Sequence, residues 1–130
     1  MKAKHSPGKI IIPPFVFPEK HEMETASFLA NLGQDVEFLK PSQTKGSKTP
    51  DIKMNGRLWE VKAPMGKSKN TILNALRRGV KQSKYIVIDL RITQIDDESA
   101  VKQLQNSIAK VKSIKKVIVI LKTSKVIELS

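Results

Sequence analysis

At 130 residues and 39% hydrophobic content, the chain is long enough to form one globular domain with its own core. The absence of cysteine excludes disulfide bonds and thiolate metal sites, and indicates a reducing compartment or a fold that needs no disulfides. The longest apolar run, residues 117–121, is far too short to span a membrane, and no signal peptide is recognisable. The formal net charge of +12 favours a polyanionic partner.

The first eighteen residues contain four prolines and two apolar runs, at 10–12 and 15–17. Prolines at this density disfavour regular structure, so we expect residues 1–18 to form an extended N-terminal arm packed by its apolar runs. Residues 19–130 are then predicted to form a single domain.

A helix is predicted over residues 19–32, closed by Gly33 as a glycine after the helix end. Glu22 falls in the middle of its apolar stripe, whereas Glu24 lies about 200° away around the helix. A carboxylate in an apolar stripe is costly without a partner, so Glu22 is a candidate site acid and Glu24 is expected in solvent. The alternative is that Glu22 only complements the helix dipole.

Asn55 and Gly56 lie between two segments that alternate in polarity, which predicts a β-hairpin with a type I′ turn. That register places Asp51 directly opposite Glu60, with two like charges about 5 Å apart across the ladder. The two acids repel each other unless a cation such as a divalent metal lies between them. Lys62 follows on the same strand face as Glu60. The alternative is an ordinary solvent-facing charged strand.

The opposite face of the hairpin carries Ile52, Met54, Trp59 and Val61 and is predicted to face the core. Further elements are expected as a strand at 35–39, a helix at 70–83, a buried strand at 85–90, a helix from 96 to 112, a buried strand at 116–122 and an edge strand at 125–129. Helices between buried strands predict an α/β fold, a three-layer α/β/α sandwich with a central mixed sheet. Gln82, at the end of the second long helix, is placed to reach the site.

The positive charge is concentrated around the two hairpin acids. Residues 40–84 hold twelve Lys or Arg against Asp51 and Glu60 alone, a net charge of +10. A basic field centred on an acidic pair is expected where a polyanion is drawn to a metal, although a basic surface that only aids solubility is the alternative. The residues expected to contact nucleic acid are Lys45, Lys48, Lys53, Lys67, Lys69, Arg77, Arg78 and Lys81. Three later lysines, Lys115, Lys116 and Lys125, follow the predicted sheet away from the hairpin and are expected to contribute much less.

Asp51 after Pro50, eight further residues and then Glu60-Val61-Lys62 resembles the Pro-Asp…(Asp/Glu)-x-Lys signature of the restriction-endonuclease-like nuclease superfamily, called PD-(D/E)XK. The resemblance covers residues 19–122 and implies the core of that fold. Within the superfamily, several segments are similar to the C-terminal tRNA-nuclease domains of contact-dependent growth inhibition toxins. These segments are 22–26, 49–51, 55–56, 59–62, 82–83 and 88–90.

The resemblance implies a metal-dependent hydrolysis of phosphodiester bonds in RNA, with tRNA as the substrate. Glu22, Asp51 and Glu60 would bind the metal, with Lys62 as the catalytic lysine and Gln82 in support. Hard oxygen ligands favour Mg²⁺, with Mn²⁺ or Zn²⁺ as alternatives. A toxin domain would act in the cytoplasm of a bacterial target cell and would be neutralised by a cognate immunity protein.

Three alternatives remain at this point. A small DNA endonuclease or Holliday-junction resolvase of the same fold would share the signature, and a resolvase would act as a homodimer. A non-catalytic nucleic-acid-binding module would keep only the basic surface. Because the sequence starts at Met1 without a delivery region, both an excised toxin domain and a free-standing relative are open.

Overall fold

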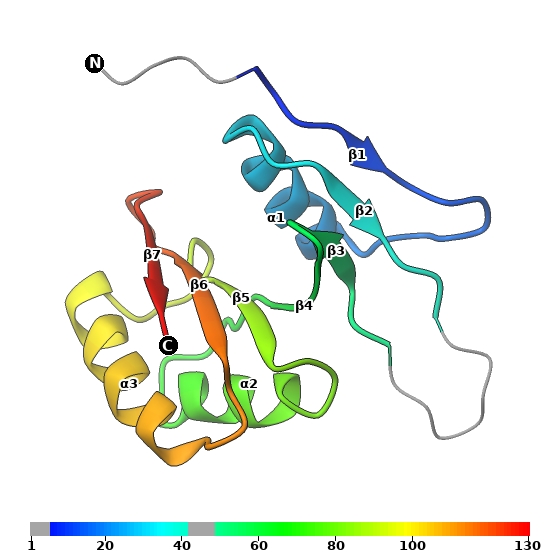
Figure 1. Cartoon of the computed structure of the whole chain (residues 1–130). Helices are drawn as coiled ribbons and strands as arrows, with labels where there is room; N and C mark the ends of the chain where they lie inside the picture. Colours follow the sequence, from blue (N-terminus) through cyan, green and yellow to red (C-terminus); the bar gives the residue numbers. More distant parts are fainter. Residues whose placement is uncertain (1–5, 42–48) are drawn as a thin grey trace. The chain divides into compact units, whose positions relative to one another are not determined.

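The computed structural model describes residues 6–41 and 49–130, so Lys45 and Lys48 lie outside the described residues. The chain divides into two compact units, an N-terminal unit of residues 1–59 and a C-terminal unit of residues 60–130 (Figure 1). The two units are described in turn.

The described residues of the N-terminal unit form a helix and short strands. Helix α1 (Lys20–Asn31) contacts strands β1 (Ile10–Ile11) and β2 (Val36–Phe38). Strand β1 runs parallel to β2, and β2 runs antiparallel to β3 (Ile52–Met54). Strand β3 in turn pairs antiparallel with the first half of β4 (Arg57–Lys62).

The ends of α1 follow the local sequence signals. The N–H groups of Gly33 and Gln34 donate to the carbonyls of Ala30 and Leu29, at 2.9 and 3.2 Å, and Gly33 has a positive φ of 97°. This pair of bonds is the Schellman arrangement, which confirms Gly33 as the residue that closes the helix. The buried face of α1 consists of Thr25, Ala26, Leu29 and Ala30.

The predicted hairpin is confirmed. Asn55 and Gly56 have φ angles of 55° and 73°, as a type I′ turn requires. The ladder pairs Met54 with Arg57, Lys53 with Leu58 and Ile52 with Trp59, which is the expected register. The four residues predicted to face the core, Ile52, Met54, Trp59 and Val61, are all buried. The indole N–H of Trp59 also donates to the Met54 carbonyl at 2.9 Å, so its one polar atom is satisfied inside the core.

The N-terminal arm differs from the expectation. Ile10 and Ile11 form β1, which the sequence did not predict as a strand, and the side chains of Phe15 and Phe17 are 91% and 86% exposed. The expectation that the run at 15–17 packs is therefore wrong. Phe15 has a φ of 64°, a backbone conformation that turns the chain between β1 and α1.

The C-terminal unit is built from two strand–helix–strand crossovers. Strands β4, β5 (Tyr85–Asp89) and β6 (Lys116–Ile120) are parallel, and β7 (Val126–Leu129) is antiparallel to β6. Helix α2 (Thr71–Gly79) connects β4 to β5, and α3 (Asp97–Lys110) connects β5 to β6. Parallel neighbours need such crossover helices.

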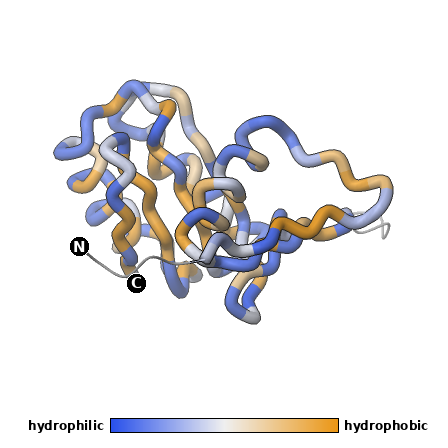
Figure 2. The backbone as a smooth tube through the Cα atoms, turned by 90° about the horizontal axis from the view of Figure 1, so that it is seen from above, coloured by the Kyte–Doolittle hydropathy of each residue, from blue (hydrophilic) through white to orange (hydrophobic). Residues whose placement is uncertain are grey.

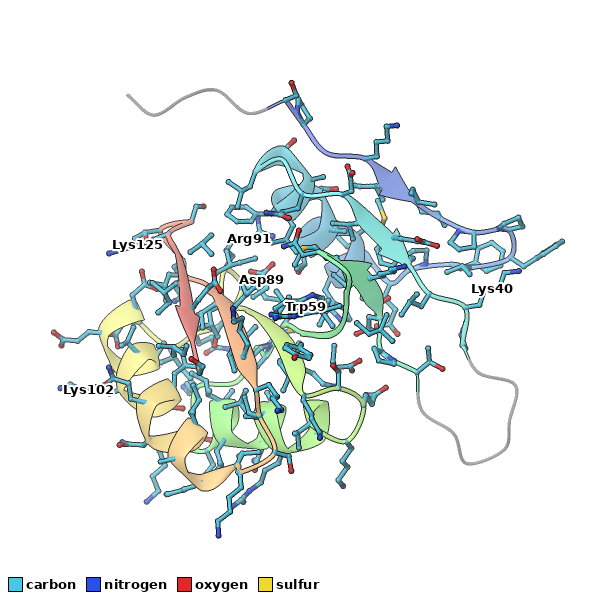
Figure 3. The ribbon with its side chains drawn as sticks, viewed as in Figure 1. Lys40, Trp59, Asp89, Arg91, Lys102 and Lys125 are labelled. Carbon is cyan, nitrogen blue, oxygen red and sulfur yellow. The ribbon has the colours of Figure 1, made fainter. Side chains whose placement is uncertain are left out.

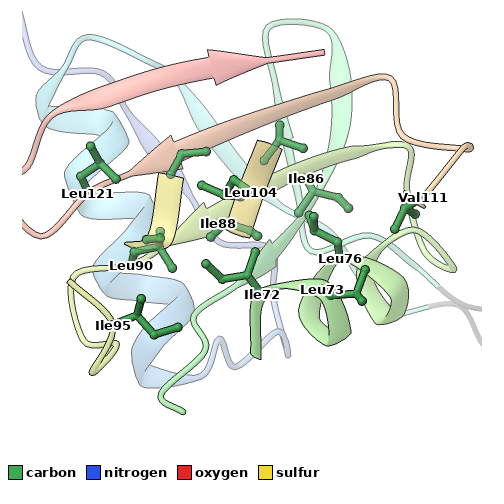
Figure 4. Close-up of a cluster of buried hydrophobic side chains, with 13 residues drawn as sticks. Ile72, Leu73, Leu76, Ile86, Ile88, Leu90, Ile95, Leu104, Val111 and Leu121 are labelled. Carbon is green, nitrogen blue, oxygen red and sulfur yellow. The ribbon is translucent and has the colours of Figure 1, made fainter. Parts of the chain in front are cut away.

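One hydrophobic cluster joins these helices to one face of the strands (Figure 4). It includes Ile72 and Leu76 from α2, Leu104 from α3, and Ile86 and Ile88 from β5, all of them fully buried. Figure 2 shows the hydrophobic stretches inside this unit and the hydrophilic residues at its turns.

The strands pair in the order β1-β2-β3-β4 up to the hairpin and β4-β5-β6-β7 in the C-terminal unit, with both parallel and antiparallel pairs. The predicted α/β class and mixed sheet are confirmed. Within the described ranges, no helix has the length and apolar character needed to cross a membrane.

Helix α2 ends earlier than expected. Its last residue is Gly79, and Gln82 and Ser83 lie on a turn whose N–H groups donate to the Gly79 carbonyl at 2.9 and 3.0 Å. The Ser83 hydroxyl then accepts the N–H of Tyr85 at 3.0 Å, a local bond that competes with continued helix. Gln82 therefore lies after the end of α2, three residues before β5 begins.

Two of the late lysines lie further along the sheet from the hairpin, as expected, but close to Lys84. Strand β5 separates β6 from β4 of the hairpin. The N–H groups of Lys115 and Lys116 donate to the carbonyl of Lys84, at 2.8 and 3.3 Å, so both lie beside the last residue of the basic region at 40–84. The reason is topological, because the parallel crossover through α3 returns the chain to the end of the sheet where β5 begins.

Gly8 provides a test of how the arm is attached to the N-terminal unit. Its N–H donates to the Ala30 carbonyl at 2.7 Å, and a Cβ atom at this position would overlap the Gln34 carbonyl. Because a backbone carbonyl held by a helix end cannot easily move, we expect Gly8→Ala to lower the free energy of unfolding by about 1–3 kcal/mol. Gly56→Ala is the control, since nothing surrounds Gly56 and only its positive φ opposes a side chain, at a cost of about 1–2 kcal/mol. Chemical denaturation measures both, and an unchanged stability for Gly8→Ala would show that the arm is not held at this point.

Candidate active site

The C-terminal unit contains a buried carboxylate, Glu60, that contacts two other polar side chains. Glu60 is 3% exposed, and its Oε2 accepts a hydrogen bond from Gln82 Nε2 at 2.7 Å. The same oxygen lies 3.3 Å from Lys62 Nζ. These contacts bring together three of the residues singled out in the sequence.

The burial of Glu60 follows from the strand pairing. Glu60 and Lys62 pair with Ile86 and Ile88 of β5, so they share the strand face that α2 covers. A Cβ atom at Gly79 of α2 would lie 3.1 Å from Ile86 Cδ1 and 3.6 Å from Lys62 Cγ. The glycine thus leaves room for the aliphatic stem of Lys62, whose side chain remains 25% exposed. The hairpin face that carries Glu60 and Lys62 was expected to be polar, and it is partly covered by the end of α2.

The N-terminal unit holds a second acidic group. Glu22 occupies the first turn of α1, on the buried side of the helix, and its Oε1 accepts the N–H of Glu19 at 3.0 Å. Burial raises the pKa of Glu22, and the neighbouring Asp51 carboxyl raises it further by charge repulsion and by a hydrogen bond between the two side chains. The Glu19 N–H acts in the opposite direction. Glu24 is exposed, as predicted.

The structure therefore places the predicted residues in two groups, one in each unit. Glu22 lies with Asp51, and Glu60 lies with Lys62 and Gln82. The ladder of the hairpin ends at Ile52 and Trp59, one residue short of the pair expected between Asp51 and Glu60. That these groups make one site stays a prediction.

Two further residues at the start of α1 were not found by sequence reasoning. Glu19, His21 and Glu22 offer ligand atoms that all lie within 4.8 Å of one another. His21 Nδ1 lies 3.4 Å from Glu19 Oε2. The spacing Glu-x-His-Glu at a helix start was the available signal, and the capping position of Glu19 is what folds its side chain back toward the first turn.

The predicted phosphate-binding residues that the structure describes divide into separate places. Lys67 and Lys69 precede α2, whereas Arg77, Arg78 and Lys81 lie at its other end, with about 13 Å of helix between them. All five side chains are exposed. The group at the end of α2 is the one that shares its turn with Gln82.

Lys53 differs from the others because carboxylates surround it. It pairs with Glu37 across the β2–β3 ladder, and with Glu37 and Asp35 it lines a hollow of about 180 Å³ in the N-terminal unit. Nearby negative charge makes Lys53 less suited to hold a phosphate than the five lysines and arginines on and beside α2.

Asp89, in the segment 88–90, belongs to a separate ion pair. It is buried at the end of β5, and Arg91 Nε and Nη2 donate to its two oxygens at 2.9 and 2.7 Å (Figure 3). Glu60 pairs at the opposite end of β5, beside Ile86. The forked Asp89–Arg91 pair fixes the exit of β5.

The raised pKa of Glu22 predicts that ionising this residue lowers the free energy of unfolding of the metal-free protein at neutral pH. With its pKa above the ordinary value of 4.5, the contribution of protonated Glu22 to stability is fully present below pH 4.5 and is lost as the pH rises through the folded-state pKa. Glu22→Gln keeps an acceptor for the Glu19 N–H and removes the charge. We expect it to be more stable than the wild type at about pH 7, by less than about 1 kcal/mol because solvent screens a partly exposed group.

Chemical denaturation in EDTA at both pH values measures this difference. The gain should disappear below pH 4.5, and Glu24→Gln, which changes an exposed carboxylate on the same helix, should show no such pH-dependent gain. A Glu22→Gln protein that is less stable than wild type at neutral pH would contradict the assignment of Glu22 to a strained acidic pair.

Comparisons with known proteins give the family and the fold. The model of the contact-dependent growth inhibition CdiA C-terminal domain matches residues 48–126. A solved structure, described as a CdiA-CT/CdiI toxin and immunity complex from Burkholderia pseudomallei, contains a chain with the same fold at a TM-score of 0.71. That chain is 22% identical, and the match covers 95% of this chain and 99% of the other. No curated protein sequence matches. On the family match, this chain belongs to the CdiA C-terminal domains of contact-dependent growth inhibition, which are toxin domains.

Proposed function

We propose that this toxin domain is a metal-dependent nuclease that hydrolyses phosphodiester bonds of RNA, with tRNA as its substrate. The observation that carries the proposal is the group around Glu60. A carboxylate that is almost fully buried holds the ammonium of Lys62 at the surface of a strongly basic unit. Burying such a pair is expensive and rarely adds stability, so a function is the better reason for it.

The donor atoms fit a divalent ion. Glu22 and Asp51 are neighbouring carboxyl groups, and the pKa of Glu22 is raised by burial and by Asp51, so a bound cation would offset the cost of ionising both acids. We propose that Glu22, Asp51 and Glu60 hold the ion together. When bound, a divalent ion lowers the pKa of a coordinated water and offsets negative charge on the phosphate.

Oxygen donors favour Mg²⁺ as that ion. The imidazole of His21 beside Glu22 would also suit Mn²⁺ or Zn²⁺, so these stay as alternatives.

The protein's own groups supply the remaining chemistry. Lys62 places a positive charge next to Glu60, where it offsets the charge that develops on the phosphoryl oxygens or orients the attacking water. Gln82 fixes the orientation of the Glu60 carboxylate through its 2.7 Å hydrogen bond. Arg77 and Arg78 are exposed in the last turn of α2, and Lys81 is exposed on the following turn, which carries Gln82; these three residues bind the substrate backbone by charge.

The partner of the related chain suggests a second part of the proposal. The Burkholderia pseudomallei structure is a toxin and immunity complex, and we propose that a cognate immunity protein neutralises this domain too. A net charge of +12 favours an acidic immunity protein by charge complementarity. As a toxin of this family, the domain would act in the cytoplasm of the target cell, where tRNA is found.

The metal-ligand assignment predicts which substitutions stop cleavage. Asp51→Asn, Glu60→Gln and Glu22→Gln each remove a negatively charged ligand without changing side-chain size, and we expect each to lower the cleavage rate on the order of 100-fold or more. Glu24→Gln is the matched control on the exposed side of α1 and should keep nearly full activity. The assay incubates each protein with total RNA and with single-stranded, duplex and branched DNA, in Mg²⁺ and in EDTA.

Nucleic-acid binding in EDTA should survive all of these substitutions, because each removes one negative charge from a basic protein. Full activity of Asp51→Asn or Glu60→Gln would contradict the assignment of these residues as metal ligands. A stronger effect of Glu24→Gln than of Glu22→Gln would assign the third ligand to Glu24. Cleavage of branched DNA in place of RNA would favour the resolvase alternative. Binding of nucleic acid without any cleavage would favour the alternative of a non-catalytic nucleic-acid-binding module.

A further inference from the structure

One end of the C-terminal unit collects lysines that the proposed function does not yet use. Lys84 precedes β5, Lys110 is the last residue of α3, Lys112 lies on the following turn and Lys115 precedes β6. We call these four residues the terminal lysine cluster. All four side chains are exposed.

The backbone holds the members of the cluster close together. The N–H of Lys115 donates to the carbonyl of Lys84 at 2.8 Å, which joins the two strand entries directly. A tight turn follows α3, in which the N–H of Ile114 donates to the Val111 carbonyl at 3.4 Å, and this turn places Lys112 between the helix end and Lys115. The four charges therefore occupy one end of the unit although 31 positions of sequence separate the first from the last.

The acids of the unit do not neutralise this end. Near it, within residues 60–130, Glu60 is engaged by Lys62 and Glu128 by Lys116, the latter at 3.2 Å. No member of the terminal lysine cluster makes an ion pair among the residues that the structure describes. The remaining carboxylates of the unit, Asp89, Asp96, Asp97 and Glu98, lie at the other end, where β5 finishes and α3 starts.

Stabilisation of the fold explains only part of this arrangement. A lysine in the last turn of a helix complements the helix dipole, which accounts for Lys110. Lys84, Lys112 and Lys115 lie outside the helices, and placing like charges side by side costs stability unless an anion is drawn to them. Gln82, which holds Glu60, is only two residues before Lys84.

We propose that the terminal lysine cluster is a second phosphate-binding surface, which holds the nucleic-acid backbone beyond the segment that is cleaved. The ligand is the phosphodiester backbone of an RNA long enough to reach from Glu60 to the strand entries. This inference rests on the proposed nuclease function and adds to it a surface that contacts only the longer substrates. The expectation that the late lysines contribute little is replaced for Lys115 by this role.

The test compares two triple variants that lose the same charge. One carries Lys84→Gln, Lys112→Gln and Lys115→Gln. The control carries Lys102→Gln, Lys122→Gln and Lys125→Gln. Lys102 lies on the exposed side of α3, and Lys122 and Lys125 lie near the β6–β7 turn (Figure 3), where the Lys122 N–H donates to Asp97. Affinity for labelled RNA is measured in EDTA over a series of salt concentrations, with a long RNA and with a short oligonucleotide that covers only the cleavage site.

For the cluster variant we expect the long RNA to bind at least tenfold more weakly. The slope of log affinity against log salt should become shallower by roughly 0.7–0.9 for each phosphate that the variant no longer neutralises. The short oligonucleotide should bind the cluster variant nearly as tightly as it binds the wild type. The control variant should lose less than about threefold in affinity for either RNA. Thermal stability of the cluster variant should be unchanged or higher, because like charges have been removed.

Equal losses from the two triple variants, or equal losses on long and short RNA, would overturn the inference. A lower melting temperature with an unchanged salt slope would assign the cluster to helix stabilisation. Unchanged RNA affinity would show that the cluster does not bind RNA and would favour an acidic protein as its partner. If the wild type cleaves RNA while the cluster variant binds normally, the inference alone fails. A wild type that neither binds nor cleaves nucleic acid removes the proposed function as well.

Discussion

The covering of Glu60 by the end of α2 is the constraint on which the rest of the C-terminal unit depends. Pairing with Ile86 places Glu60 on the strand face that the helix covers, so its carboxylate is 3% exposed. A buried carboxylate must be compensated, and Lys62 and Gln82 do so from the same strand and from the turn after the helix. Gly79 is part of the same constraint, since a Cβ atom there would lie 3.1 Å from Ile86 Cδ1 and 3.6 Å from Lys62 Cγ.

The direction of the strands arranges charge as well as packing. Because β4, β5 and β6 are parallel, the ends of α2 and α3 and the starts of β5 and β6 meet at one end of the unit. Lysines follow both helices there, whereas Asp96 and Asp97 start α3 at the other end. The unit is thus electrically asymmetric, and its positive end is the one that contains Glu60, an arrangement that the proposed nuclease function requires.

Signals within a few residues of one another predicted most of the fold, and contacts distant in sequence account for the rest. The Asn55-Gly56 turn, the Gly33 helix end and the position of Glu22 on its helix all depend on local geometry and were correct. The adjacency of Lys115 to Lys84 depends on a crossover, and the exposure of Phe15 depends on what packs nearby, so neither could be inferred from periodicity. His21 and Glu19 were missed because a capping geometry, and not a motif, brings them to Glu22.

The central claim is that Glu60 binds a metal and is more than the ion-pair partner of Lys62, and thermal unfolding with and without Mn²⁺ tests it most directly. At about 100 times the dissociation constant, a bound ion should add about 2.7 kcal/mol to the stability of the wild type. Lys62→Met should keep this metal-dependent increase, because it loses the ion pair and no ligand, whereas Glu60→Gln should lose it. An equal increase in Glu60→Gln, or none in the wild type, would contradict the account.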